Sequence, residues 1–335
     1  MRLSESVLHV VAVCIFLSAR FANATSANGA VLDDLLEALH EQTGVPGLSV
    51  AVSRHGNLLW HGEAGFADVT ARQAVDRDTV FRLASVSKAV CAVIAARMVE
   101  EDAIDVDARA GELMPDLPEQ YQSLTLRDLL THTSGLPHYE ARDFARGGTR
   151  YSSAVAGLEQ LGDRSLVAAP GASYLYSTHG FSLASAMLER ATEQTFTELF
   201  TRVVSVSDQW RTLALESEGS DTGRRTLIYE ASRNADPREL EREDFSYSWC
   251  GAGMEASAAD LSNFASSLFG TRSVLGRAGQ RLLAVAMRDR NGDVVIAERW
   301  LMTFGWRQST DASGENYLHH AGVTNGARSI VAVWP

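Results

Sequence analysis

From Ala84 to Val99, hydrophobic residues occupy every side of a predicted helix. A helix that is apolar all round is buried in the middle of a domain, so this segment is expected to form the centre of the fold. Other segments place hydrophobic residues three and four positions apart, which predicts amphipathic helices. These further helices are predicted at 31–39, 126–130, 181–191, 258–268 and 278–287.

Two pairs of predicted strands lie near the two ends of the chain. They are Leu48–Ser53 with Leu58–His61, around a turn at 55–57, and Tyr317–His320 with Ser329–Val333. Apolar runs around a glycine-containing turn are typical of a hairpin. Between them, residues 217–243 are polar, and we interpret them as an excursion with a strand at Thr226–Tyr229.

Strands at both ends around a helical centre predict a mixed α+β fold. We expect the strands from both chain ends to join in one antiparallel sheet with flanking helices, and a mostly helical lobe to be inserted between them. The sheet parts are placed at about 44–84 and 299–335, and the lobe at about 85–298.

The first 24 residues have the pattern of a secretory signal peptide. Arg2 precedes a short apolar run, Val7–Leu17, and Ala22-Asn23-Ala24 offers a cleavage site. The run is too short to span a bilayer. We therefore expect a secreted or periplasmic protein comprising one domain, 25–335, without stable membrane insertion. A buried N-terminal helix is the alternative.

Composition narrows the function classes. The chain has 335 residues, 45% of them hydrophobic, which is enough for a full core. Its net charge of −12 and the lack of a basic stripe argue against nucleic acid as a partner.

Its nine histidines lack metal-ligand spacing, so neither a metal nor a cofactor is expected. After signal cleavage two cysteines remain, Cys91 and Cys250; a disulfide and two free buried thiols are both open.

One lysine stands among 30 basic residues: Lys88, three positions after Ser85. Arginine stays protonated in proteins, whereas burial can lower the pKa of a lysine until its amine acts as a base. Ser85 and Lys88 lie one turn apart on the same helix face, the S-x-x-K spacing of a serine nucleophile and its base. A purely structural, buried Lys88 is the alternative.

Two further segments carry groups that such chemistry needs. Tyr176 and Thr178 lie in Tyr174–Gly180, and a tyrosine beside a lysine cation can ionise and act as a base. In His319–Val323, Gly322 allows close backbone approach, and the N–H of Val323 could join that of Ser85 in an oxyanion hole. Taken alone, each segment is a weak signal.

Together and in this order, the three segments resemble the serine β-lactamase-like superfamily. This superfamily includes class C β-lactamases, D-alanyl-D-alanine carboxypeptidases, family VIII esterases and D-aminopeptidases. The likeness is greatest to the mitochondrial serine β-lactamase-like proteins and their bacterial relatives. It covers nearly the whole chain after the leader, with further matching segments at 44–50, 124–136, 249–260 and 304–306.

The resemblance implies a role for each residue. Ser85 is acylated, Lys88 and Tyr176 relay its proton, and Ser85 and Val323 hold the oxyanion. His320 replaces a lysine that helps bind the carboxylate of β-lactams, and Thr178 replaces an asparagine, which favours a small peptide or an ester as substrate. His132, in Leu130–Leu136, is expected to be structural, and Asp128 to be a surface or capping carboxylate.

Alternative functions stay open. One is a β-lactamase or a D-alanyl-D-alanine carboxypeptidase, and another is a catalytically weak binding or assembly protein with the same fold. Family members usually continue with a strand and a C-terminal helix after the strand that ends here at Val333. Two alternatives stay open: a truncated gene product, or a homo-oligomer that covers the sheet where these elements are lacking.

Overall fold

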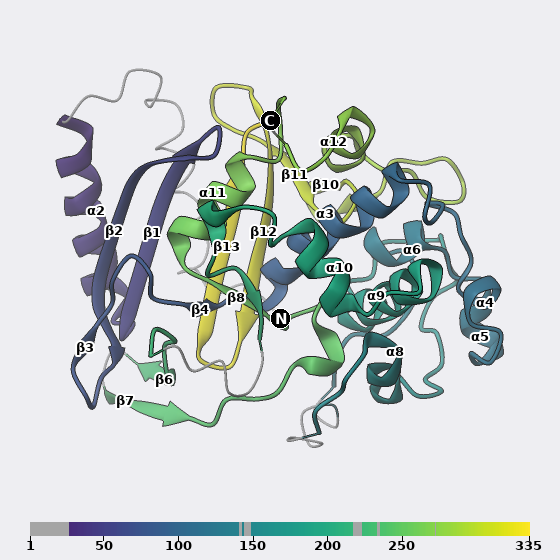
Figure 1. Ribbon diagram of the computed structural model, residues 1–335, viewed down its shortest axis with the longest axis horizontal. Helices are drawn as coiled ribbons and strands as arrows, with labels where there is room; N and C mark the ends of the chain where they lie inside the picture. Colours follow the sequence, from purple (N-terminus) through teal and green to yellow (C-terminus); the bar gives the residue numbers. More distant parts are fainter. Residues whose placement is uncertain (1–26, 141–142, 144–148, 217–222, 233–234, 272) are drawn as a thin grey trace.

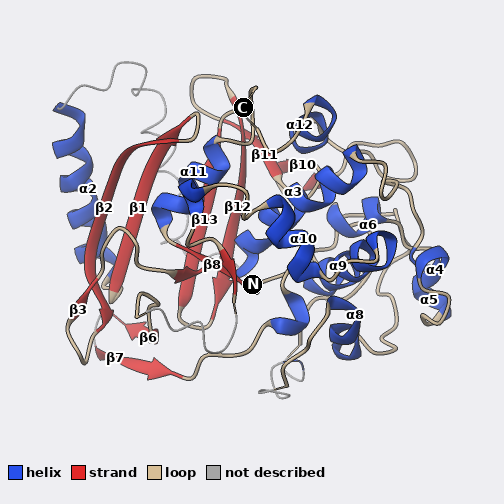
Figure 2. Cartoon of the chain, in the orientation of Figure 1, coloured by secondary structure: helices blue, strands red, loops and turns tan. Residues whose placement is uncertain are grey.

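The computed structural model describes residues 27–140, 143, 149–216, 223–232, 235–271 and 273–335. The predicted leader lies outside this range. The described chain forms two main antiparallel sheets on one side and a group of helices on the other, with α3 (Ser87–Glu100) between them (Figure 1; Figure 2).

The N-terminal part contains the predicted helix and the predicted hairpin, and the helix packs on the hairpin. Helix α2 (Ala27–Thr43) packs on β2 (Asn57–Asp68), which pairs with β1 (Gly47–Arg54) and with the short β3 (Gln73–Ala74). His55 and Gly56 form the turn with φ of 51° and 75°. Two residues with positive φ match the twist of the strands they connect.

The C-terminal part is a five-stranded antiparallel sheet. Its strand order is β13-β12-β11-β10-β9. The predicted pairing of 317–320 with 329–333 is confirmed, with His320 opposite Val331. The strands are β9 (Ile296–Ala297), β10 (Trp300–Met302), β11 (Arg307–Thr310), β12 (Asn316–Thr324) and β13 (Ala327–Val333).

The expectation that both chain ends share one hydrogen-bonded sheet is wrong for the described residues. There β1 pairs with β2 alone, and β13 pairs with β12 alone. Helix α11 (Ala258–Ser266) packs against both β1 and β13. The hydrophobic pattern of a strand specifies which face is buried, but it does not specify which strand lies at its edge.

The predicted central helix is confirmed. Residues 84–99 form the 3₁₀ turn η2 (Ala84–Val86) followed by α3, in which every side chain from Ser87 to Ala96 is buried. The other helices are α4 (Ala110–Leu113), α5 (Glu119–Gln122), α6 (Leu126–Leu130), α8 (Ala154–Gly157), η3 (Leu158–Gln160), α9 (Thr178–Thr192), α10 (Phe196–Val203), η4 (Asp208–Trp210), η5 (Ser246–Ser248) and α12 (Arg277–Ala284). Within the described range, none has the length and apolar character to cross a bilayer.

Short strands also occur among these helices. β8 (Met254–Ala256) pairs with β4 (Phe81–Arg82) and β5 (Ala214–Leu215). The strand predicted at 226–229 instead begins at Ile228: β6 (Ile228–Ser232) pairs with β7 (Ala235–Leu240). The start is later because the N–H groups of Thr226 and Leu227 donate to the carbonyls of Val80 and Ala67.

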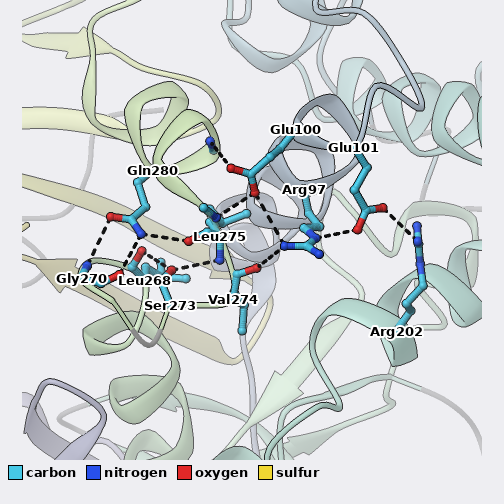
Figure 3. A network of polar contacts seen from close by, with 12 residues as sticks. Arg97, Glu100, Glu101, Arg202, Leu268, Gly270, Ser273, Val274, Leu275 and Gln280 are labelled. Carbon is cyan, nitrogen blue, oxygen red and sulfur yellow. Dashed lines mark hydrogen bonds and ion pairs between the residues drawn. The ribbon is translucent and has the colours of Figure 1, made fainter.

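Polar contacts fix the far end of α3 (Figure 3). The Glu100 carboxylate accepts from the N–H groups of Gly276 (2.8 Å) and Gly279 (3.2 Å), at the start of α12. Glu101, the residue after α3, binds Arg97 on α3 and Arg202 on α10. A carboxylate at a helix N-terminus satisfies free backbone donors, so these contacts hold α3 against two neighbouring helices.

Candidate active site

Ser85 lies in a backbone segment held from two sides. The N–H of Leu83 donates to the carbonyl of Met254 at 2.9 Å, and the Ser329 hydroxyl donates to the carbonyl of Leu83. Ala84 has a φ of 48°, in the left-handed region that disfavours a residue with a Cβ. The chain then enters η2 and α3, so the half-buried Ser85 lies at the positive end of the central helix.

Lys88 lies one turn further on and is completely buried. Its Nζ is 3.1 Å from Ser85 Oγ, 2.7 Å from the carbonyl oxygen of Gly251 and 3.0 Å from Thr178 Oγ1. Burial holds the pKa of Lys88 well below its usual value, and the charge of Arg307 lowers it further. A neutral amine donates two hydrogens, here to Gly251 and Thr178, which leaves its lone pair for the Ser85 hydroxyl.

A loop on the helical side positions Tyr176. The backbone carbonyl of His132 accepts a hydrogen bond from the N–H of Leu175 at 2.7 Å. The ring Nδ1 of His132 accepts one from the N–H of Ser177 at 3.1 Å. His132 thus satisfies local backbone, as expected. Its ring also lies 4.3 Å from that of Tyr176, so it borders the site in space and not only in sequence. Ser177 then caps α9, whose first residue is Thr178.

The interpretation of Tyr176 as a phenolate beside a lysine cation is not favoured by the directions of the two pKa shifts. Burial raises the pKa of Tyr176, although the charge of Arg307 and hydrogen bonding with Ser85 and Thr178 act in the opposite direction. Because the pKa of Lys88 is lowered, Lys88 does not supply the cation that this interpretation requires. Tyr176 is therefore a neutral phenol, which can both accept and donate a proton.

The third segment packs its backbone against Ser85. β11 pairs with β12 only up to Arg307 opposite His319, so His320–Thr324 has only β13 beside it among the described strands. η2 contacts β12. A Cβ on Gly322 would lie 2.2 Å from the Leu83 carbonyl oxygen and 3.0 Å from the Ser85 nitrogen. Only glycine permits this approach, which brings the backbone around Val323 to Ser85.

His320 is buried and neutral. Burial lowers the pKa of His320 well below its usual value, and the charge of Arg307 lowers it further. Its Nδ1 lies 2.9 Å from the carbonyl oxygen of Ala321, so the neutral ring donates from Nδ1. Nε2 is then an acceptor, and it has no hydrogen-bond partner in the described part of the chain.

With this geometry in place, comparison with known proteins identifies the family. Residues 32–335 match the sequence profile of the beta-lactamase family. The chain belongs to this family. The sequence resemblance to the serine β-lactamase-like superfamily is thereby confirmed, and the family is one of serine hydrolases built on a common fold.

Two relatives of this beta-lactamase family member differ in the share of the chain that they match. The mitochondrial serine beta-lactamase-like protein LACTB of Bos taurus is 23% identical over 400 residues, which cover 90% of this chain and 71% of that protein. Esterase EstB of Burkholderia gladioli is 31% identical over 173 residues, which cover 47% of this chain and 44% of EstB.

Among solved structures, the octameric penicillin-binding protein homologue from Pyrococcus abyssi superposes with a TM-score of 0.74 at 17% identity, covering 91% of this chain and 70% of that one. This likeness shows a β-lactamase/transpeptidase-like fold. The predicted α+β class is therefore confirmed.

The sequence analysis did not predict two chemical groups that lie beside Lys88 and Tyr176 in this candidate active site. The first is the Gly251 carbonyl, which any residue could supply and no pattern reveals. The second is Arg307, whose guanidinium carbon lies 5.7 Å from the centre of the Tyr176 ring and 4.8 Å from that of Trp300. One arginine among 29 gives no signal, although Arg307 directly follows the matching segment Phe304-Gly305-Trp306.

The two cysteines left open by the sequence form a disulfide. Cys91 on α3 and Cys250 have Cα atoms 5.1 Å apart and are bonded through sulfur. Both are completely buried. Asp128 is buried as well, so it is not a surface carboxylate; it caps α6 together with Thr125 and pairs with Arg290.

A cavity of about 630 Å³ lies apart from this site. It is bordered by the β1–β2 turn, η4, the segment before β6 and α11, and it includes neither Ser85 nor Lys88. The groups that can perform acyl transfer are therefore not those that line this cavity.

Proposed function

We propose that this protein is a serine hydrolase that forms an acyl-enzyme on Ser85 and acts on a small peptide or an ester. The contact that carries the proposal is that of the buried Lys88 amine, 3.1 Å from Ser85 Oγ, with its pKa held low. A serine hydroxyl becomes a strong nucleophile when a neighbouring base takes its proton.

The first step is attack of Ser85 Oγ on the substrate carbonyl while its proton moves to Lys88 Nζ. The N–H groups of Ser85 and Val323 stabilise the oxyanion that forms. Tyr176, a neutral phenol, then gives its proton to the leaving group and recovers one from Lys88. Water attacks the acyl-enzyme in the second half of the reaction, its proton passes to Ser85 Oγ through the same groups, and the acid product leaves.

The substrate class follows from two side chains. The neutral His320 stands where β-lactamases carry a lysine cation, and Thr178 has no amide to contact an acylamino side chain. Both differences favour peptides and esters over β-lactams.

We also propose that the protein is exported. The signal-like sequence 1–24 and the buried Cys91–Cys250 disulfide support export, because disulfides persist mainly in oxidising compartments. Expression in a secreting host should yield a chain that begins at Thr25, as read by intact mass. A cytosolic, uncleaved product would contradict export.

The test of function is intact mass after treatment with a fluorophosphonate probe. The wild type should gain one adduct, and Ser85→Ala should gain none. A folded wild type without an adduct would favour a binding or assembly protein of the same fold. Turnover of a chromogenic cephalosporin at ordinary rates would instead favour a β-lactamase.

A further inference from the structure

An ion pair that water barely reaches lies beside the segment that carries Ser85. Nε of Arg82, on β4, lies 3.0 Å from each carboxylate oxygen of Glu216. The two side chains are only 1% and 5% exposed. The Arg82 guanidinium also donates to the backbone carbonyl of Glu243 at 2.6 Å, and its carbon lies 4.7 Å from the centre of the Phe245 ring. The acyl-transfer steps proposed above make no use of this ion pair.

The ion pair reaches across β8. In the three-stranded sheet, β8 lies between β4 and β5, and Glu216 directly follows β5. Arg82 is opposite Glu255 of β8, and the N–H of Glu216 donates to the carbonyl of Gly253 at 2.8 Å. Side chains of paired residues, and of residues two positions apart, share one face of a sheet. Arg82 and Glu216 therefore hold the two outer strands against the strand between them.

β8 connects this ion pair to Lys88. Gly251, whose carbonyl lies 2.7 Å from the Lys88 amine, comes just before the first residue of β8, Met254. The carbonyl of Met254 accepts from the N–H of Leu83 at 2.9 Å, and its N–H donates to Ser87 Oγ at 3.1 Å. A shift of β8 relative to β4 would therefore move Gly251 relative to Lys88.

Stability alone does not account for charges at this place. Glu255 pairs with Arg225 and lies 3.7 Å from Arg242, which also pairs with Glu216. Two carboxylates that are each 5% exposed are thus shared among arginines. Apolar side chains of similar volume often stabilise a fold as well as a buried ion pair does. An ion pair differs in its directional hydrogen bonds, which allow one arrangement of the strands.

We propose that Arg82 and Glu216 are positioning residues of the candidate active site. Their ion pair across β8 keeps the Gly251 carbonyl within hydrogen-bond distance of the Lys88 amine. With one amine hydrogen committed to Gly251, the lone pair of Lys88 is directed at Ser85. The inference rests on the proposed function and deepens it, because it names residues that act through Lys88 without touching the substrate.

The test is a double-mutant cycle on the rate of acylation by a fluorophosphonate, read by timed intact mass of the full chain. Arg82→Met should slow acylation roughly tenfold to a hundredfold, the loss expected when a reacting group moves by about 1 Å. In the Lys88→Arg background there is no base to direct, so the same substitution should change the rate by less than about twofold. A loss of folded protein would instead lower both rates by the same factor.

Two further variants separate position from folding. Glu216→Gln keeps the volume of the side chain and removes its charge, so it should slow acylation in the same Lys88-dependent way, even if Arg82→Met does not fold. The matched control is Leu32→Ala, which removes buried atoms of α2 where this helix packs on β1 and β2. It should lower the midpoint of urea denaturation and leave the acylation rate of the folded protein unchanged.

Three results would overturn this inference while wild-type Ser85 still takes an adduct. One is a folded Arg82→Met or Glu216→Gln variant that is acylated at the wild-type rate. Another is an equal loss of rate in the Lys88→Arg background, and the third is failure of both variants to fold; each of these gives the ion pair a structural role only. If wild-type Ser85 takes no adduct, the proposed function fails, and this inference fails with it.

Discussion

Cys250 is bonded to Cys91 and directly precedes Gly251, whose carbonyl lies 2.7 Å from the amine of Lys88. Cys91 lies on the same helix as Lys88. The disulfide thus joins the helix that carries the proposed base to the loop that directs its hydrogens. Because one amine hydrogen is committed to Gly251, the lone pair can be directed at Ser85 only while this loop stays in place.

Removing the disulfide should therefore affect both stability and reactivity. We expect the double variant Cys91→Ala and Cys250→Ala to lose roughly 2–5 kcal/mol in free energy of unfolding, because the bond closes a long loop. At temperatures where the variant stays folded, its rate of acylation by a fluorophosphonate should also fall. Urea denaturation and timed intact mass measure the two effects. An unchanged acylation rate would show that Gly251 holds its position without the bond.

Burial of a neutral Lys88 should lower stability at neutral pH. The unfolded chain binds a proton at Lys88 up to its usual pKa of 10.5, whereas the folded chain releases it at lower pH. The unfolding free energy attributable to this group therefore rises with pH between the folded pKa and 10.5. Lys88→Met should be more stable than the wild type near pH 7, with a difference that shrinks toward pH 10.

Urea denaturation at pH 7, 8.5 and 10 gives this difference directly. A difference that does not depend on pH would mean that Lys88 is protonated in the folded protein, against the lowered pKa that its burial implies.

Gly322 should not tolerate a side chain. A Cβ there would lie 2.2 Å from the carbonyl oxygen of Leu83, so Gly322→Ala must push β12 away from the backbone of Ser85. We expect a loss of roughly 1–3 kcal/mol in stability, as for other overpacked sites, together with much slower acylation. The matched control is Gly29→Ala in α2, where a Cβ meets nothing within 4 Å and should stabilise the helix by about 0.5–1 kcal/mol. Full activity in Gly322→Ala would exclude a tight contact between β12 and Ser85.

The parts of this site that could be predicted from sequence are those set by local geometry. Ser85 and Lys88 share a helix face because they are three residues apart, and the apolar flanks of that helix predict the lowered pKa of Lys88. Tyr176, Thr178, His320 and Gly322 came from segments that are weak signals alone and were connected only by family resemblance.

The rest depends on contacts between distant segments. The Gly251 carbonyl reaches Lys88 from 163 positions away, and a backbone group leaves no mark in the sequence. The position of Arg307 in the site depends on where β11 begins beside β12. A phenolate at Tyr176 would need a cation at Lys88, but the burial that makes Lys88 a base also disfavours its charge. The separate sheets at the two chain ends reflect edge partners, which periodicity does not encode.

The central claim is that a neutral Lys88 takes the proton of Ser85, and the most direct measurement is the pH dependence of Ser85 acylation by a fluorophosphonate in the wild type and in Lys88→Arg. Because the pKa of Lys88 is held well below 10.5, the wild-type rate should reach its plateau well below pH 10.5 and fall at lower pH, as the amine gains a proton. Lys88→Arg keeps a charge but no base, so it should react roughly 10²–10⁴-fold more slowly. A wild-type rate that climbs until about pH 10.5, or a Lys88→Arg variant that acylates at the wild-type rate, would contradict the claim.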